Sequence, residues 1–120
     1  SSPRRDELLV ALAGPASNLF LGSLLGIIHL TTDFYHPILQ IIALTNFSLG
    51  VFNLLPLPPL DGSKIFLNLI PIESAIKWRE AFDRYGYFLI AIFLFLPFAG
   101  GNLISFLVSP PVNFLYRLFF

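Results

Sequence analysis

Three long apolar stretches, separated by short polar segments, dominate the 120-residue chain. They cover about residues 8–30, 37–60 and 86–108. Each is long enough to supply the roughly 20 residues of helix that cross a hydrocarbon core. The pattern therefore predicts an all-α, multi-pass transmembrane protein, with residues 1–120 forming a single integral membrane region.

The segment between the second and third stretches has a different pattern. Ile72, Ala75, Ile76 and Phe82 can share one helical face, and opposite charges recur there at a spacing of four residues. We expect an amphipathic helix over about residues 72–84, lying at the membrane interface. A mobile polar loop is the alternative.

Further breaks are expected towards the C-terminus. The sequence PFAGGN, residues 97–102, should either kink the third span or end it early. After Pro110 and Pro111, the sequence VNFLYRLFF predicts a short helix that is either interfacial or packed against the rest.

Composition agrees with a membrane protein and excludes several classes of function. The chain is 56% hydrophobic and 12% charged, and its mean hydropathy is +0.79. Its formal net charge is zero, so no basic surface for nucleic acid is indicated. The absence of cysteine excludes disulfides, thiolate metal sites and cysteine nucleophiles. Any zinc ligands in this chain must be His, Asp or Glu.

The distribution of positive charge predicts an orientation. Arg4 and Arg5 precede the first span, and the basic residues after the second span are Lys64, Lys77, Arg79 and Arg84. The loop TTDFYHP between these spans has no Lys or Arg. By the positive-inside rule, the first two spans form a hairpin whose outer ends, and with them Asp61, lie towards the cytoplasm.

Small residues recur along the first span. Gly14, Asn18, Gly22 and Gly26 are each four residues apart, so they form one stripe on a helix. Small side chains let helices approach closely in lipid, and the Asn18 amide needs a partner there. Pro15 removes one helical hydrogen bond.

The second span carries polar groups and then breaks. Asn46, Gly50 and Asn53 lie on one helical face. Pro56 deprives the helix of a donor, and the sequence PLPPL that it begins is expected to be extended, close to polyproline geometry. Broken backbone at membrane depth is tolerated only inside protein or beside a wet cavity. The break therefore predicts a cavity wall.

Asp61 follows the break directly, and the sequence GSKIFLNLI after it predicts a new helix. The carboxylate could be the N-cap of that helix. It could also be one ligand of a metal ion, because an uncompensated carboxylate near the bilayer interior costs roughly 3 kcal/mol. The pattern alone leaves both interpretations open.

Two motifs resemble a known family. ALAGPASNLFLG is similar to the Gly-Pro-x-x-Asn segment of the site-2 protease family of intramembrane zinc metalloproteases. FNLLPLPPLDG is similar to that family's Asn-x-x-Pro and Leu-Asp-Gly segment, and the two motifs occur in the family's order. No soluble domain separates them, so the chain resembles compact members without an inserted PDZ module.

The resemblance implies a zinc metalloprotease that cleaves membrane-protein substrates inside the lipid bilayer. It makes Asp61 the third protein ligand of the zinc, with Gly62 permitting a tight turn beside it. It makes Asn53 the residue that supports the oxyanion or positions the substrate carbonyl. Gly14, Pro15 and Asn18 match the family's structural motif.

One departure concerns the rest of the site. The family takes its other two zinc ligands and its general base from a His-Glu-x-x-His helix. The only histidines here, His29 and His36, lack that spacing, and we expect them at the opposite end of the hairpin from Asp61. We therefore expect the chain to be the later part of a protease domain whose metal-binding helix lies upstream in the same polypeptide, and the isolated chain to be inactive.

Two other classes of function are compatible with the pattern. A non-catalytic relative could use the same fold as a membrane scaffold, with Asp61 only a helix cap. A transporter component could use the broken helix and its carboxylate for an ion site.

Overall fold

The structure is a computed structural model that describes residues 2–33 and 36–120. Within these residues the chain is almost entirely helical, which confirms the predicted all-α class. In chain order the elements are α1 (Pro3–Thr31), α2 (Pro37–Asn53), α3 (Asp61–Leu69), α4 (Ile72–Phe95), β1 (Pro97–Phe98), β2 (Gly101–Asn102) and α5 (Leu103–Phe119). The two strands form a minimal antiparallel hairpin.

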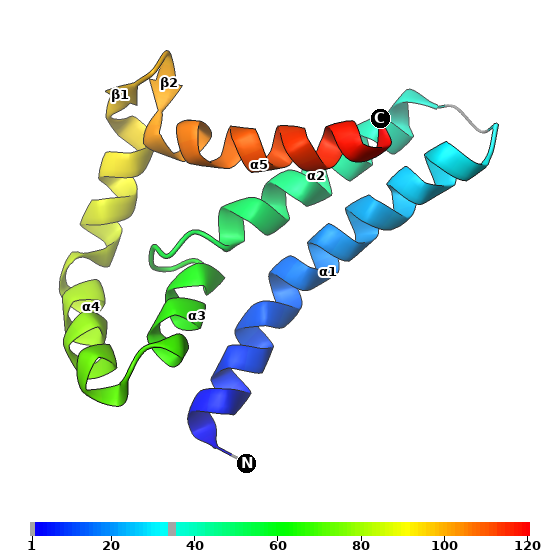
Figure 1. Cartoon of the computed structure of the whole chain (residues 1–120). Coiled ribbons are helices and arrows are strands. Elements are labelled where there is room, and N and C mark those ends of the chain that lie inside the picture. Colours follow the sequence, from blue (N-terminus) through cyan, green and yellow to red (C-terminus); the bar gives the residue numbers. More distant parts are fainter. Residues whose placement is uncertain (1, 34–35) are drawn as a thin grey trace.

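Helices α1 and α2 form an antiparallel hairpin, and the other helices are arranged around it (Figure 1). The short helix α3 runs back along the N-terminal half of α1. Helix α5 packs across α2 and reaches the C-terminal end of α1. The Cα atoms extend over 53 × 42 × 17 Å, so the arrangement is flat. Such a flat arrangement encloses only a small core, and many large apolar side chains are exposed.

Glycines on α1 allow the helices to pack closely, as the small-residue stripe predicted. A Cβ atom on Gly22 would lie 2.7 Å from Cε1 of Phe47, and one on Gly26 would overlap the Phe119 side chain. Phe47 is fully buried and belongs to the small core cluster with Ala43 and Val112. At Gly22 and Gly26 the stripe is thus the surface on which α2 and α5 pack.

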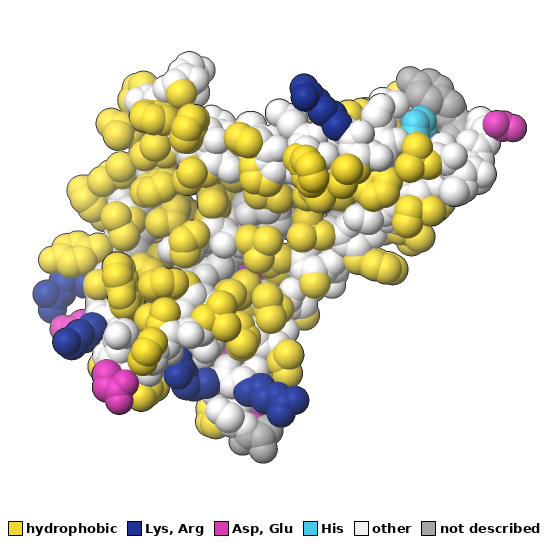
Figure 2. Space-filling view, in the orientation of Figure 1, with side chains coloured by type: hydrophobic (Ala, Val, Ile, Leu, Met, Phe, Trp, Pro, Cys, Tyr) yellow, Lys and Arg dark blue, Asp and Glu magenta, His cyan; other side chains and the backbone are white. Residues whose placement is uncertain are grey.

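One described helix, α1, is long and apolar enough to cross a membrane by its length and composition. Helices α2 and α5 are apolar but shorter, with 17 residues each. Large apolar side chains are nevertheless exposed over most of the visible surface, and Phe95 is 81% exposed (Figure 2). The dark blue Lys and Arg side chains gather mainly around the start of α1 and the first half of α4.

The second predicted span is shorter than expected. Helix α2 ends at Asn53, and the sequence that follows is turned rather than extended. The Leu57 amide donates to the Leu55 carbonyl over 2.8 Å, and the Leu60 amide donates to the Leu57 carbonyl over 2.8 Å. The Pro58–Pro59 peptide bond is cis. The polyproline prediction was wrong because Leu57 and Leu60 are buried, which requires the chain to fold back instead of running on.

The predicted interfacial helix over 72–84 and the predicted third span over 86–108 are not separate elements. Helix α4 runs without interruption through both the amphipathic segment and the apolar residues up to Phe95. A single glycine, Gly86, does not stop a helix, and here it packs against Pro58. The hairpin β1–β2 then ends the apolar stretch, so residues 86–108 are divided between α4, the hairpin and α5.

Helix α5 also begins earlier than predicted. It starts after Asn102, whose side chain accepts a hydrogen bond from the Ser105 amide in a capping box. Pro110 and Pro111 lie inside this helix rather than before it. Each proline removes only one backbone donor, and Val112, directly after them, is buried in the core cluster. Tertiary packing therefore keeps the helix continuous.

Candidate metal centre where α1 meets α3

Asp61 is the first residue of α3, and its carboxylate lies beside α1. Leu60, not Asp61, is the N-cap residue of α3, so the cap interpretation of Asp61 was wrong. A Cβ atom on Gly14 would lie 3.0 Å from Oδ2 of Asp61. Asp61 is half-buried. The missing side chain at position 14 therefore leaves room for the carboxylate against the backbone of α1.

The loop between α2 and α3 is packed so tightly that glycine is required at two positions. A Cβ atom on Gly62 would overlap the carbonyl oxygens of Leu54 and Leu55. A Cβ atom on Gly86 of α4 would lie 2.9 Å from Cβ of Pro58. The start of α3 therefore packs against the residues that follow α2, and the loop before it packs against the middle of α4. Pro56, which breaks the helical pattern, is exposed.

Asn53 is the last residue of α2 and is half-buried. Its Nδ2 atom donates a hydrogen bond of 2.9 Å to the carbonyl oxygen of Leu49 in the same helix. Asn46 makes the equivalent bond, also 2.9 Å long, to the carbonyl of Ile42. A carboxamide has two N–H donors. The intrahelical bond of Asn53 thus uses one of them.

The Gly-Pro-x-x-Asn segment of α1 also contacts α2 directly. Pro15 is fully buried, and its carbonyl oxygen would lie 3.2 Å from a Cβ atom on Gly50. Asn18 lies one turn further along α1 and is half-buried. The fold therefore brings the two motifs together: Gly14 contacts Asp61, and Pro15 contacts the turn of α2 that precedes Asn53.

The far end of α3 is held by polar side chains that the sequence analysis missed. Arg4 donates from Nη2 to the carbonyl oxygens of Leu67 and Ile70, and Glu7 accepts a hydrogen bond from Asn68. This hydrogen bond, more than the nearby Arg79, lowers the pKa of Glu7, and desolvation of the carboxylate opposes the shift. The sequence did contain a signal for these contacts: Arg4 and Glu7 lie on the same face of the predicted helix as Gly14.

The histidines lie away from Asp61, as predicted. His29 is in the last turn of α1 and stacks on the Phe120 ring with a centroid separation of 4.6 Å. His36 is the N-cap of α2. At 1.5 Å per residue, His29 lies about 22 Å along α1 from Gly14. Neither histidine can therefore join Asp61 at one ion.

The described residues alone do not fit a zinc ion. Among residues 2–33 and 36–120, no group of three or more His, Cys, Asp or Glu side chains is placed to hold a metal. Structural and catalytic zinc sites use three or four protein ligands. Among the described residues, Asp61 could therefore supply at most one ligand to such an ion.

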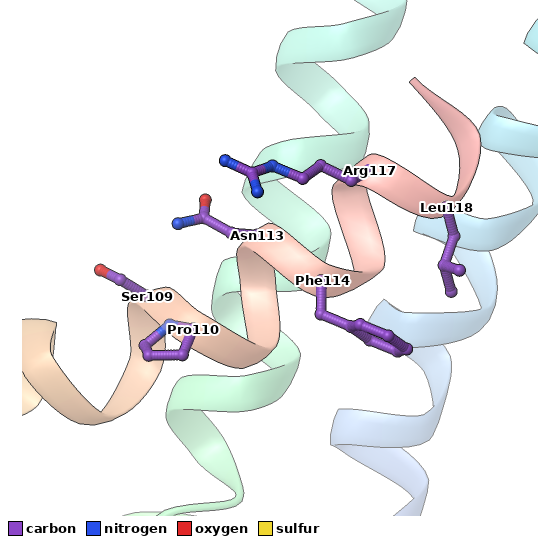
Figure 3. Close-up of a pocket in the computed structure, with 6 residues that line it drawn as sticks. All are labelled: Ser109, Pro110, Asn113, Phe114, Arg117 and Leu118. Atoms are coloured by element: carbon purple, nitrogen blue, oxygen red, sulfur yellow. The ribbon is translucent and has the colours of Figure 1, made fainter.

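A separate hollow lies on α5 and does not include Asp61 or Asn53. Figure 3 shows its polar side chains, Ser109, Asn113 and Arg117, along one side of α5. They follow one another at four-residue spacing, which places them on one stripe of the helix. This hollow is not part of the candidate metal centre.

Comparison with known proteins identifies the family. The sequence model of Peptidase family M50 matches residues 32–97, which is more than half of the chain. "Putative zinc metalloprotease YwhC" of Bacillus subtilis (strain 168) is 35% identical over 123 residues. "Zinc metalloprotease MJ0392" of Methanocaldococcus jannaschii is 31% identical over 116 residues. These alignments cover 92% and 93% of this chain.

The relatives are longer than this chain. The alignments span 53% of the Bacillus protein and 34% of the Methanocaldococcus protein. No solved structure matches the chain. The family match and the relatives agree with the resemblance that the two motifs indicated. The chain therefore belongs to peptidase family M50.

Proposed function

We propose that the chain is the Asp61-bearing part of a zinc-dependent protease that cleaves membrane-embedded substrates. The observation that carries the proposal is the contact between Gly14 and Asp61, because it joins two motifs that are far apart in the sequence. The relatives' names as zinc metalloproteases support the chemistry.

In this proposal Asp61 is one oxygen ligand of the zinc, and the other ligands come from polypeptide outside these 120 residues. A His-Glu-x-x-His helix is the expected source, because it presents two imidazoles and a general base on one face. Bound zinc would polarise the substrate carbonyl and lower the pKa of a coordinated water. The isolated chain is expected to be inactive and to bind zinc weakly.

The chain's own residues have distinct roles in the proposed site. The tight start of α3, made possible by Gly62, fixes the backbone that carries Asp61. Asn53 lies at the end of α2, where its remaining N–H can donate to a substrate carbonyl or to the oxyanion that develops from it. Pro56 ends the helical pattern and so permits the turned loop between these two residues.

The proposed setting is a multi-pass membrane domain with the Asp61 end towards the cytoplasm. The Arg4 contacts with α3 support a hairpin whose two outer ends lie on the same side. Basic residues concentrate at that end, as they do on the cytoplasmic side of membrane proteins (Figure 2).

The experiment that tests the proposal uses the full-length polypeptide, purified in detergent. Its zinc content and its cleavage of a model transmembrane substrate are measured before chelation, after chelation and after zinc is restored. We expect stoichiometric zinc and cleavage that disappears and returns with the metal. The isolated 120-residue chain is the control. A full-length protein that holds no zinc would instead indicate the non-catalytic scaffold.

A further inference from the structure

We infer that Arg4 and Glu7 are positioning residues that hold α3 in register along α1, so that the Asp61 carboxylate lies at Gly14. The inference rests on the proposed zinc centre, in which Asp61 is a ligand. It concerns residues at the opposite end of α3 from the metal, which do not touch the reacting atoms.

Arg4 binds the C-terminal end of α3. Its Nη2 atom donates to the Leu67 carbonyl over 2.7 Å and to the Ile70 carbonyl over 2.6 Å. The last carbonyls of a helix have no partner within the helix. A guanidinium there also interacts favourably with the negative end of the helix dipole. Arg4 therefore supplies hydrogen-bond donors to carbonyl groups at the C-terminal end of α3.

Glu7 adds a second contact one turn along α1. Its Oε1 atom accepts a hydrogen bond of 2.9 Å from Nδ2 of Asn68. The same carboxylate oxygen lies 3.4 Å from Nη2 of Arg79 on α4. The carboxylate therefore joins α1, α3 and α4 at one point, and α3 is fixed both along α1 and against α4.

These contacts define a register between two antiparallel helices. Arg4, Glu7 and Gly14 lie in phase on α1 and meet, in that order, the end, the last turn and the start of α3. Between them, the buried residue Ala11 completes the same face. The whole length of α3, and not only Asp61, thus lies against this face of α1.

The register matters because α3 is short. It has nine residues, and a helix of that length is marginal in water without tertiary contacts. A slide by one turn along α1 would move Asp61 by about 5.4 Å. Such a slide would carry the carboxylate away from Gly14, where it would have to lie to serve as the proposed ligand.

The first experiment compares two neighbouring arginines in the full-length protein. Zinc affinity is measured by competition with a chelator for the wild type, for Arg4→Ala and for Arg5→Ala, in which an exposed side chain of the same charge is removed. We expect Arg4→Ala to weaken zinc binding by about 10- to 100-fold, as loss of supporting contacts around a metal ligand does. Arg5→Ala should stay within about twofold of the wild type. Equal effects of both variants would overturn the inference.

The second experiment separates positioning from a general loss of stability. The 120-residue chain has no cysteine, so Glu7→Cys and Asn68→Cys introduce a pair that a short bifunctional thiol reagent can join. The pair is combined with Arg4→Ala, and any other cysteine of the full-length protein is replaced. We expect crosslinking to restore zinc affinity to within about threefold of the wild type. Zinc affinity that stays low after crosslinking would overturn the inference. The same outcome applies if Arg4→Ala alone does not fold, because the crosslinked protein is then the variant that is measured.

Failure of this inference is distinguishable from failure of the proposed function. A wild-type protein without zinc overturns the proposed function, and the inference with it. Zinc in the wild type together with unchanged affinity in Arg4→Ala overturns the inference alone.

Discussion

Helix α1 uses glycine in the same way at Gly14 and in its C-terminal half, but different groups occupy the space that glycine leaves. At Gly22 and Gly26 the space is filled by the aromatic side chains of Phe47 and Phe119. At Gly14 it is filled by the carboxylate of Asp61. An aromatic ring in such a space buries apolar surface, whereas a carboxylate brings a charge that needs a counter-charge or a metal.

The surroundings of the two halves of α1 differ accordingly. Around its C-terminal half they are aromatic, with Phe47 and Phe119 stacked at 6.2 Å between centroids and Tyr116 and Phe120 stacked at 5.0 Å. The N-terminal half of α1, which includes Gly14, instead has hydrogen bonds and charged side chains from α1, α3 and α4, at the end of α3 opposite to Asp61. The comparison teaches that a glycine stripe by itself does not reveal a site, and that the group facing each glycine does.

The largest expected effect comes from removing the carboxylate. In the full-length protein, Asp61→Ala should abolish tight zinc binding and reduce proteolysis to background, because a catalytic zinc site has only three protein ligands. The control is Asp33→Ala, which removes an exposed carboxylate at the other end of the hairpin. Zinc content is measured by atomic spectrometry. Tight zinc in Asp61→Ala would show that Asp61 is not a ligand.

A smaller effect is expected from the amide at the end of α2. Asn53→Ala should reduce turnover by about 100-fold or more with zinc retained, if the amide stabilises the oxyanion. Asn46→Ala is a matched control, because both side chains make the same 2.9 Å bond to a carbonyl four residues earlier in α2. Turnover and zinc content are measured for both variants. A similar loss of turnover in the two would indicate a shared structural role.

The smallest effects are expected at the glycines of α1, and they should differ between Gly22, which faces an aromatic ring, and Gly14, which faces Asp61. Gly22→Ala places a methyl group 2.7 Å from the buried Phe47 ring, and such overpacking should lower the stability by about 1–3 kcal/mol with zinc affinity unchanged. Gly14→Ala should instead force the Asp61 side chain off its rotamer, at about 0.5–1.5 kcal/mol. This corresponds to a roughly 2- to 10-fold loss of zinc affinity.

Thermal unfolding in detergent and zinc competition are measured for both glycine variants. Alanine favours a helix over glycine, so Gly14→Ala should not unfold more easily than the wild type. If both variants changed the same property, the distinction between a packing glycine and a site glycine would be lost.

Local rules already contained in the sequence determined much of the fold. The run of apolar residues to Leu30 specified α1, and the prolines after Asn53 specified a break followed by a new helix at Asp61. The sequence also separated the histidines from Asp61, because it placed them at the turn of the predicted hairpin and Asp61 at its open end. The two motifs indicated the family before any contact was known.

The tertiary structure decided what those rules leave open. Only packing showed what Gly86 contacts, because Pro58 lies in the loop between α2 and α3, far from α4 in the sequence. Only packing showed that Arg4 binds the end of α3, because this contact joins residues more than sixty positions apart. Periodicity reports which residues share a face of one helix, but not which neighbour covers that face. The contact between Gly14 and Asp61 depends on that neighbour, and so it could not be predicted from either helix alone.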